Sequence, residues 1–248
     1  MPAPARWPAT SVQRRPARGA GLRHASLGLL LLAADAIAQL SGTVSVTSDY
    51  RYRGVSLSRG DPAAQASLAY DDVSGLYAGL FGSNVQFAIS PHRELELVPY
   101  AGYVRRFASG VSGEIGVDYA TFTGPGSYDY AELYAGVADD RLSARLYYAR
   151  RYFGRDAGAI YAEANAAQPL ADRIRLLAHI GVLRNLGGES PYGPTDREVI
   201  DGRLGVAVDV DRFTVQASWV GVSSASTGYP ISGRDRRNTA VATLSLAF

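Results

Sequence analysis

Polar and apolar residues alternate with a period of two over much of this chain. From position 43 to position 53 the odd positions hold Thr43, Ser45, Thr47, Asp49, Arg51 and Arg53. The even positions hold mostly apolar or aromatic residues, namely Val44, Val46, Tyr50 and Tyr52. Successive side chains of a β-strand point to opposite faces of the sheet. The alternation therefore predicts strands with one polar face and one apolar face.

The same alternation recurs in segments that lie far apart in the sequence, at 114–119, 142–151, 173–182 and 239–248. With its flanking residues, each segment reaches about the 9–11 residues that a tilted strand needs to cross a bilayer. A soluble β-sandwich also has alternating strands, because one face of each sheet packs on the core. Alternation alone therefore predicts an all-β fold and leaves both architectures open.

The lengths of the connections separate the two architectures. We predict twelve strands, at residues 41–55, 62–71, 75–85, 94–106, 111–122, 128–138, 141–153, 158–168, 172–184, 199–209, 212–222 and 237–248. Even-numbered strands are followed by short polar connections such as 72–74, 139–140 and 210–211, and longer connections such as 86–93, 185–198 and 223–236 alternate with them. Short periplasmic turns, longer extracellular loops and an even strand number are typical of bacterial outer-membrane barrels. We therefore predict a closed antiparallel transmembrane β-barrel, with both termini in the periplasm.

The first 38 residues have the order of a secretory signal peptide. Four arginines between Arg14 and Arg23 precede an apolar run at 25–34, and Ala36-Ile37-Ala38 offers a cleavage site with small residues. A membrane anchor would need about 18 or more apolar residues, and this run is much shorter. We predict cleavage after Ala38, which leaves residues 39–248 as a single outer-membrane barrel domain of a Gram-negative bacterium.

Composition excludes several other classes of protein. Removal of residues 1–38 takes away five arginines and one aspartate, so the formal charge falls from +2 to −2 and a nucleic-acid partner loses its support. The chain has no cysteine, so no disulfide can stabilise the exported domain. The mean hydropathy of −0.06 gives no sign of a transmembrane helix. It does not argue against a transmembrane barrel, because apolar lipid-facing residues and polar lumen-facing residues alternate along each strand and their hydropathies cancel in the mean.

Several segments resemble the TorF-type family of porins, also catalogued as bacterial proteins of unknown function (Gcw_chp). The most specific segment is S-D-Y-x-x-R-G-x-S, formed by residues 48–56. The other matching positions are Pro62, Gln65, Gly75, Tyr77, Gly79, Ser83, Asn84, Glu94, Glu96, Tyr100, Gly102, Tyr103, Tyr130, Glu132 and Tyr134. The resemblance spans most of the mature chain and is densest in its first third. It implies an outer-membrane barrel with a porin role.

By resemblance to outer-membrane proteins in general, Phe248 at the end of an alternating strand implies recognition by the barrel-insertion machinery.

The polar faces are expected to point into the lumen, because an arginine facing the middle of the bilayer would cost about 2–4 kcal/mol. The residues that we expect to line the lumen are Asp49, Arg51, Arg53, Glu94, Glu96, Glu114, Asp118, Glu132, Arg145, Arg151, Glu163, Arg173, Arg175, His179, Asp201 and Arg203. If acids and bases gather on opposite walls, they select solutes by charge across a water-filled constriction. If they interleave, they form ion pairs that fill the barrel. The sequence leaves both arrangements open, and Arg51 and Arg53 fit either a solute contact or an ion pair with a nearby acid.

A few residues are expected to serve structure. Gly54, Gly75 and Gly79 are interpreted as turn or packing glycines. Tyrosines at the membrane interfaces commonly form girdles, and we expect this role for Tyr50, Tyr52, Tyr77, Tyr103 and Tyr119. Pro99 removes a ladder donor from its strand, so we expect a bulge there or a later start of the strand.

We predict an outer-membrane porin that allows passive diffusion of small hydrophilic solutes and that contacts outer-membrane lipid. The first alternative is a non-conducting barrel that displays the loops 185–198 and 223–236 for adhesion or assembly. A lipid-modifying enzyme is a further alternative, but the mature chain has only His92 and His179, and neither lies in a lipase motif. No spacing of metal ligands and no phosphate-binding loop is present, so we expect no cofactor, no metal and no catalytic residues.

Overall fold

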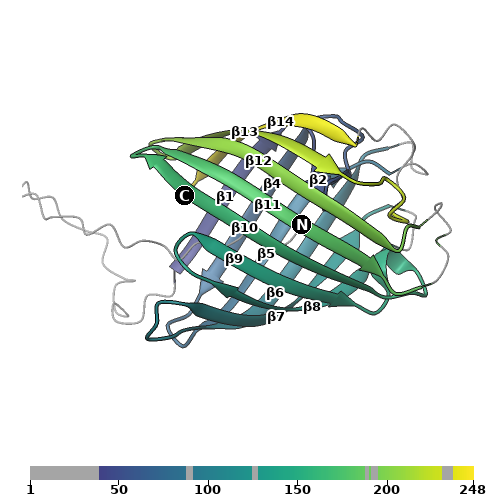
Figure 1. Cartoon of the computed structure of the whole chain (residues 1–248), viewed down its shortest axis with the longest axis horizontal. Coiled ribbons are helices and arrows are strands. Elements are labelled where there is room, and N and C mark those ends of the chain that lie inside the picture. The colour runs from purple at the N-terminus through teal and green to yellow at the C-terminus, as the bar shows by residue number, and fades with distance from the viewer. Residues whose placement is uncertain (1–38, 88–91, 125–127, 188–189, 191–194, 231–236) are drawn as a thin grey trace, which may run out of the picture.

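The computed structural model describes residues 39–87, 92–124, 128–187, 190, 195–230 and 237–248. The predicted signal peptide lies outside these residues. Twelve antiparallel strands form a closed barrel in the order β1-β14-β13-β12-β11-β10-β9-β8-β7-β6-β5-β4 (Figure 1). Among the described residues, no helix is long and apolar enough to cross a membrane.

The barrel strands are β1 (Gln39–Thr47), β4 (Ala63–Asp71), β5 (Leu76–Val85), β6 (Glu94–Arg106), β7 (Ser112–Phe122), β8 (Tyr130–Ala138), β9 (Leu142–Ala149), β10 (Ala159–Ala171), β11 (Ile174–Asn185), β12 (Glu198–Val210), β13 (Phe213–Val222) and β14 (Asn238–Ala247). A hairpin of β2 (Arg51–Tyr52) and β3 (Val55–Ser56) and the short 3-10 helix η1 (Tyr152–Gly154) complete the described elements. The predicted closed twelve-stranded antiparallel barrel is confirmed.

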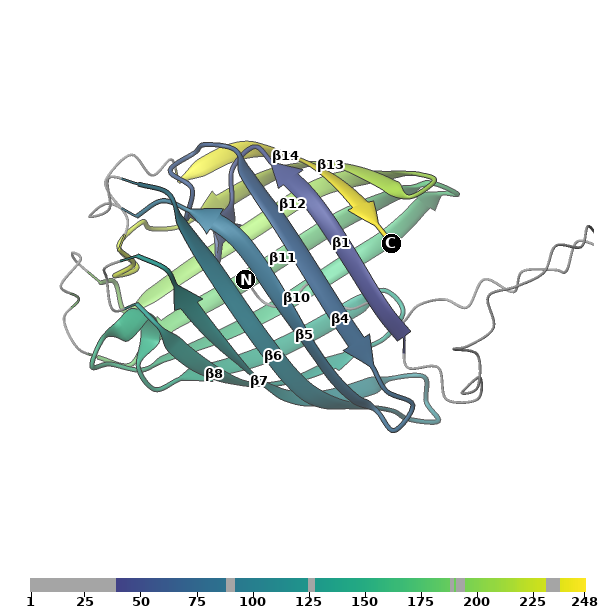
Figure 2. The same ribbon diagram turned by 180° about the vertical axis from the view of Figure 1, so that it is seen from behind.

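Short and long connections lie at opposite ends of the barrel, as predicted. One end, here called the short-turn end, carries the connections 72–75, 107–111, 139–141, 172–173 and 211–212. The opposite, long-loop end carries the connections 48–62, 86–93, 123–129, 150–158, 186–197 and 223–237. Strands β1 and β14 begin and end the barrel at the short-turn end, beside each other (Figure 2).

The predicted faces of most strands are also confirmed. On β7, Ile115 is 63% exposed on the outer surface, whereas Asp118 is 5% exposed inside the barrel. Leu142 and Leu146 of β9 likewise face outward, and Arg145 between them faces inward. Charged side chains thus avoid the outer surface along the middle of the strands, where each would be costly, and the outward-facing Arg105, Arg184 and Glu198 lie at strand ends.

The barrel closes through the pairing of β1 with β14. Beyond the last registered pair, Phe248 exchanges two backbone hydrogen bonds with Gly42, N to O at 2.9 and 3.0 Å. The Phe248 ring lies over Gly42, where a Cβ atom would stand 2.4 Å from the ring. Glycine at position 42 therefore allows the terminal aromatic residue to cover the seam.

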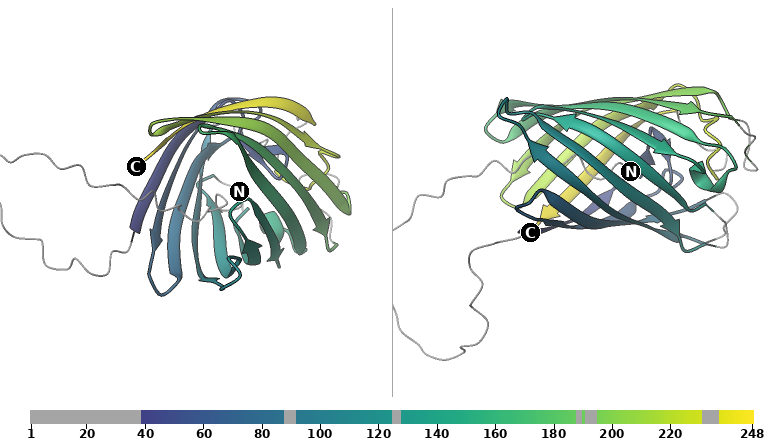
Figure 3. Two further views of the ribbon diagram at one scale, coloured as in Figure 1. Left: turned by 60° about the vertical axis from the view of Figure 1, so that its left-hand side comes forward. Right: turned by 90° about the horizontal axis from the view of Figure 1, so that it is seen from below.

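The first predicted strand, 41–55, is wrong at its end, because β1 stops at Thr47. The chain then turns into the barrel as the β2–β3 hairpin, in which Arg51 pairs with Ser56 and Tyr52 with Val55 (Figure 3). The two turn residues, Arg53 and Gly54, have φ of 49° and 80°. Two positive φ angles are the mark of a type I′ turn, whose twist suits a tight hairpin.

Two smaller expectations also need correction. The strand predicted at 141–153 ends at Ala149, where the chain bends toward η1. β6 runs through Pro99 without a bulge. Residues 98 and 99 form no registered pair with β7, but the pairs on either side, Leu97 with Thr121 and Tyr100 with Asp118, have the same register. Pro99 faces outward and only interrupts the ladder, whereas the register shift of a bulge occurs near Pro169 in β10.

Inside the barrel, tyrosine rings lie over glycines of neighbouring strands. Tyr100 lies over its cross-strand partner Gly79, and Tyr77 lies over its partner Gly102. A Cβ atom on either glycine would stand 2.3–2.4 Å from the tyrosine. Missing Cβ atoms therefore give the large rings room to lie flat along the wall, an arrangement that covers the glycine backbone.

We expect Gly79→Ala to destabilise the barrel by about 1–3 kcal/mol, because the new methyl group overlaps the Tyr100 ring and the Leu68 carbonyl oxygen. Gly82→Ala, on the outer face of the same strand, is the matched control, since its Cβ meets no atom closer than 3.3 Å. Urea unfolding in lipid vesicles, followed by the fluorescence of Trp219, measures both variants. Equal stability of the two variants would contradict the Tyr100–Gly79 packing.

Candidate functional site

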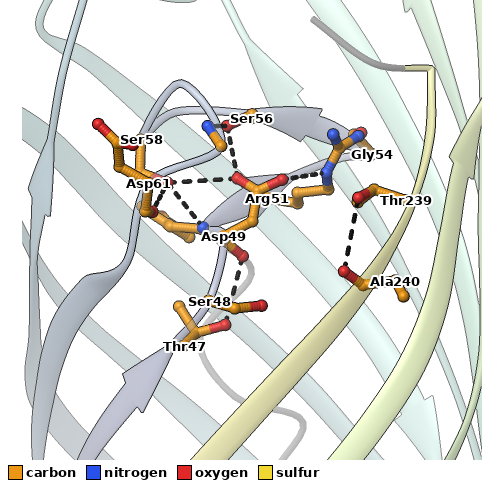
Figure 4. Close-up of polar contacts among 12 residues, drawn as sticks. Thr47, Ser48, Asp49, Arg51, Gly54, Ser56, Ser58, Asp61, Thr239 and Ala240 are labelled. Atoms are coloured by element: carbon orange, nitrogen blue, oxygen red, sulfur yellow. Dashed lines mark hydrogen bonds and ion pairs between the residues drawn. The ribbon is translucent and has the colours of Figure 1, made fainter.

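The β2–β3 hairpin is fixed at its base by Asp49. Its carboxylate accepts hydrogen bonds from Ser56 Oγ at 2.5 Å and Ser58 Oγ at 3.2 Å, and Arg51 Nε donates to it at 2.7 Å (Figure 4). Arg51 Nη1 donates to the carbonyl oxygen of Gly54 at 2.7 Å. Asp49 thus joins both strands of the hairpin and its turn into one unit.

At the tip of the hairpin, Arg53 makes a buried ion pair with Glu132 of β8. Its Nη2 donates to the two carboxylate oxygens at 3.0 and 2.8 Å, and Nη1 donates to the Tyr152 hydroxyl at 2.7 Å. The side chains of Arg53 and Glu132 are 1% and 3% exposed. The guanidinium carbon also lies 4.1 Å from the centre of the Tyr161 ring and 4.7 Å from that of Tyr52, within cation–π range.

Other hairpin residues reach the remaining walls of the barrel. Tyr50 donates to Glu96 of β6 at 2.7 Å. Gly54 approaches β12 and β13 so closely that a Cβ atom would stand 2.6 Å from Asp201 Cβ and 2.9 Å from Val222 Cβ. With Glu132 on β8, the hairpin contacts walls all around the barrel. It therefore crosses the lumen as a plug.

Apolar and aromatic side chains complete this plug toward the long-loop end. Val55 and Leu57 of the hairpin are fully buried, as are Phe87, Tyr128 and the η1 residues Tyr152 and Phe153. Phe153 stacks on Tyr229 from the loop before β14, with ring centres 4.3 Å apart. Loops at the long-loop end thus contribute rings that pack inside the barrel mouth.

A second polar cluster occupies the wall of β5 to β9. Arg145 donates from Nε and Nη2 to the Glu114 carboxylate, at 2.5 and 3.2 Å. Tyr77 also donates to Glu114 at 3.2 Å, and its hydroxyl is 2.8 Å from that of Tyr134. This charge pair is thus enclosed by tyrosines and belongs to the packed part of the lumen.

Between the hairpin and the short-turn end lies a lumen cavity of about 430 Å³. Its hydroxyl and amide lining includes Thr43, Ser45, Thr47, Gln65, Asn165, Thr214, Gln216, Ser218, Thr243 and Ser245, and its charged lining is Asp49, Arg51, Arg53, Glu163, Arg175, Asp201 and Arg203, together with His179. The walls come from β1, β4, β5 and β10 to β14, with the hairpin at one end, and Phe81, Leu177, Val220 and Val241 form an apolar part of the lining. A cavity with this lining suits water and hydrophilic solutes.

His179 connects three strands at the edge of this cavity. Its Nδ1 lies 2.8 Å from Asn165 Oδ1 of β10, and its Nε2 lies 2.8 Å from Asp201 Oδ1 of β12. Tyr161 donates to the same aspartate at 3.0 Å. Both ring nitrogens of His179 thus have a partner within the wall, as expected for a histidine with a structural role.

Eight of the sixteen predicted lumen residues line the cavity, namely Asp49, Arg51, Arg53, Glu163, Arg175, His179, Asp201 and Arg203. Six others face the interior within the packed regions, namely Glu94, Glu96, Glu114, Asp118, Glu132 and Arg145. The prediction is wrong for Arg151 and Arg173, which are exposed and lie outside the strands, in the loop before η1 and in the turn after β10.

The predicted tyrosine girdle is only partly correct. Tyr103 and Tyr119 are 40% and 44% exposed on the outer surface. Tyr50, Tyr52 and Tyr77 are buried inside the barrel instead, because the hairpin turns inward and β5 directs Tyr77 to its lumen face. The expectations for the glycines hold, since Gly54 and Gly75 have positive φ and Gly79 lies beneath Tyr100.

Acidic and basic groups interleave within the barrel. In addition to Arg53–Glu132 and Arg145–Glu114, ion pairs join Arg51 to Asp49 at 2.7 Å and Arg175 to Asp209 at 2.8 Å. This favours the interleaved arrangement over two opposed walls of charge. Arg203 differs, because it lines the cavity with no ion pair or hydrogen bond to any described residue.

The sequence reasoning missed the contributions of Tyr152, Phe153 and Tyr229. Tyr152 and Phe153 fall in the predicted strand 141–153 but lie in η1, and Tyr229 lies in a loop, where side chains have no periodicity that assigns them a face. The Arg53-Gly54 pair was a usable signal, because a glycine in a two-residue connection between alternating residues favours a tight hairpin.

Comparison with known proteins identifies the type of barrel. Residues 33–248 match the model of a family described as bacterial protein of unknown function (Gcw_chp). The NanC porin is 8% identical, with a TM-score of 0.56 over 85% of this chain and 99% of that chain. The KdgM porin in complex with disordered oligogalacturonate is 11% identical, with a TM-score of 0.52 over 84% and 97% of the two chains. No curated protein matches in sequence. The chain thus has the barrel fold of these outer-membrane porins.

The buried ion pair yields a stability prediction. We expect Arg53→Met to destabilise the barrel by about 3–5 kcal/mol, because it leaves the Glu132 carboxylate buried without its counter-charge. Adding Glu132→Gln removes that charge and should restore much of the loss. Arg106→Met is the control, since Arg106 and Asp140 form an exposed pair at 3.4 Å, which is worth less than about 1 kcal/mol. The free energies of unfolding are measured by urea unfolding in vesicles. If the losses caused by Arg53→Met and Glu132→Gln simply add in the double variant, the proposed coupling between Arg53 and Glu132 is refuted.

Proposed function

The chain belongs to the bacterial family Gcw_chp, and we propose that it is a TorF-type outer-membrane porin through which small hydrophilic solutes diffuse passively. The observation that carries this proposal is the polar cavity of about 430 Å³ inside a closed barrel. Hydroxyl, amide and charged groups line it, and these can replace the water that a polar solute loses on entry. Passive diffusion needs no catalytic residue, and the proposal assigns none.

The β2–β3 hairpin is proposed as the constriction of this pore. Arg51 and Arg53 both lie on it and line the cavity, so a solute that crosses the barrel must pass their guanidinium groups. The ion pairs with Asp49 and Glu132 hold these groups in place. Conduction through the plug requires either a narrow path for ions beside the hairpin or a displacement of the hairpin from Glu132.

The proposed location is the outer membrane, with the long loops outside the cell. Residues 1–38 would direct export, and the terminal Phe248 would present the barrel to the insertion machinery. In support, the outer surface carries exposed leucine, valine and isoleucine side chains around the barrel, which require contact with lipid. The short-turn end would then face the periplasm.

A non-conducting barrel is the second candidate, and the plug supports it. Between the cavity and the long-loop end, the barrel is filled by side chains that include the fully buried Val55, Leu57 and Tyr152. A lumen filled in this way is found in barrels that are plugged rather than open. In that case the function would reside in the loops 185–198 and 223–236, of which several residues lie outside the described structure.

Single-channel conductance of the refolded protein in planar bilayers tests the proposal. We expect wild-type protein to give small steps, and deletion of Tyr50–Leu57 to enlarge them severalfold by removing the plug. Thr47 pairs with Ala63, so the chain can still connect β1 to β4 after this deletion. An Arg51→Ala, Arg53→Ala double variant should shift selectivity toward cations, because the constriction loses two positive charges.

An Arg105→Ala, Arg106→Ala variant is the matched control, since it removes the same charge from exposed positions at the short-turn end. Its selectivity should stay close to that of the wild type. A heat-modifiable barrel that passes no current, with or without the hairpin, would overturn the porin proposal. Current in the deletion variant alone would favour the non-conducting candidate.

A further inference from the structure

A second cavity, of about 360 Å³, lies at the long-loop end, where β11 and β12 leave the barrel wall. The described residues that line it are Arg184, Asn185, Leu186, Gly187, Thr195 and Arg197. Two of these are arginines and none is acidic. The cavity is separate from the lumen cavity, with which it shares no lining residue.

Of the two lining arginines, Arg197 has no charge partner in the described part of the chain. Arg197 is exposed, and its side chain makes no ion pair or hydrogen bond there. Arg184 is 3.6 Å from Glu198, with both side chains about half exposed. Asn185 N donates to the Arg197 carbonyl oxygen and extends the β11–β12 ladder, so Asp196 lies on the face of Arg184 and Glu198, opposite that of Thr195 and Arg197.

A third arginine, Arg155, lies buried behind this cavity and is only 2% exposed. Its Nε donates to the Tyr152 carbonyl oxygen at 3.0 Å, and its Nη2 donates to the side-chain oxygen of Asn185 at 2.7 Å. Its Nη1 has no partner, and no described carboxylate lies within ion-pair distance. Desolvation lowers the pKa of Arg155, although an arginine remains charged at any physiological pH.

Unsatisfied polar atoms also converge beside this guanidinium. Thr195 Oγ1 and Thr227 Oγ1 are buried without a partner. At Gly228, whose φ is +75°, a Cβ atom would stand 2.6 Å from Thr195 Oγ1 and 3.0 Å from Arg155 Nη1. The glycine therefore leaves these two donor groups facing the same small space. A buried positive charge and unpaired donors are costly to keep without an acceptor.

We infer that this cavity, here called the mouth site, binds the anionic group of a ligand, a carboxylate or a phosphate. Arg197 is exposed and supplies the N–H donors that reach the anion, since guanidinium groups match the oxygens of carboxylates and phosphates well. Arg155 is a positioning residue. It holds the Asn185 side chain through Nη2 and adds a fixed positive charge behind the cavity wall. Nothing in this inference requires the barrel to conduct.

The test uses the full barrel in nanodiscs of zwitterionic phosphatidylcholine, titrated with inorganic phosphate against sodium chloride of equal ionic strength. Isothermal titration calorimetry should show saturable binding to wild-type protein. Arg197→Gln should weaken it about tenfold through the loss of one charge-assisted interaction, and Arg155→Gln should weaken it less, because it removes only the fixed charge and the hydrogen bond to Asn185. Arg93→Gln, another exposed arginine at the long-loop end but outside the cavity, should leave binding unchanged.

Nanodiscs of anionic phosphatidylglycerol distinguish the source of the anion. A soluble ligand predicts the same phosphate affinity in both lipids, whereas a lipid headgroup in the site would block phosphate binding in phosphatidylglycerol alone. Absence of saturable binding in phosphatidylcholine, or equal binding by wild-type protein and Arg197→Gln, would overturn the mouth site. Heat-modifiable migration verifies that each variant is folded, and the exposed Arg197 keeps the test valid if the buried substitution prevents folding.

Discussion

The structure depends on one constraint, which is that no backbone N–H or C=O group can remain unpaired in hydrocarbon. A sheet satisfies this constraint only by closing on itself, and here β14 pairs with β1 to do so. The close contact of Phe248 with Gly42 extends this seam by two further hydrogen bonds. Closure then fixes the two environments of every strand, lipid outside and lumen inside, from which the alternation of residue types follows.

Closure also creates an interior that side chains must fill or hydrate. In this barrel the interior is divided along its length. The hairpin, η1 and Tyr229 pack the part nearest the long loops, while the part nearest the short turns keeps a polar cavity. Arg53 links the two parts, because its guanidinium group pairs with Glu132 inside the plug and the residue is also part of the cavity lining.

The residues that carry the family resemblance meet in this plug. Tyr50 and Arg53 of the S-D-Y-x-x-R-G-x-S segment bind Glu96 and Glu132, which lie 46 and 79 positions further along the chain. The tyrosines and glycines of the resemblance also pair with one another, as Tyr100 does with Gly79. Much of the resemblance therefore describes how the barrel interior is filled.

The sequence by itself determined the barrel, its twelve strands, the sides of its connections and the faces of most strand residues. These features are local, because the period of two follows from the geometry of a single strand and connection length follows from adjacent strands. Only the tertiary structure decided that residues 49–58 leave the wall, that Tyr50 and Tyr52 face inward, and that Arg155 lies behind the mouth site. The segment 43–53 alternates except at Ser48, and the period of two on either side of Ser48 is the same on the wall and in the plug. What separates the two is pairing across the lumen, above all Arg53 with Glu132, and no local pattern contains that contact.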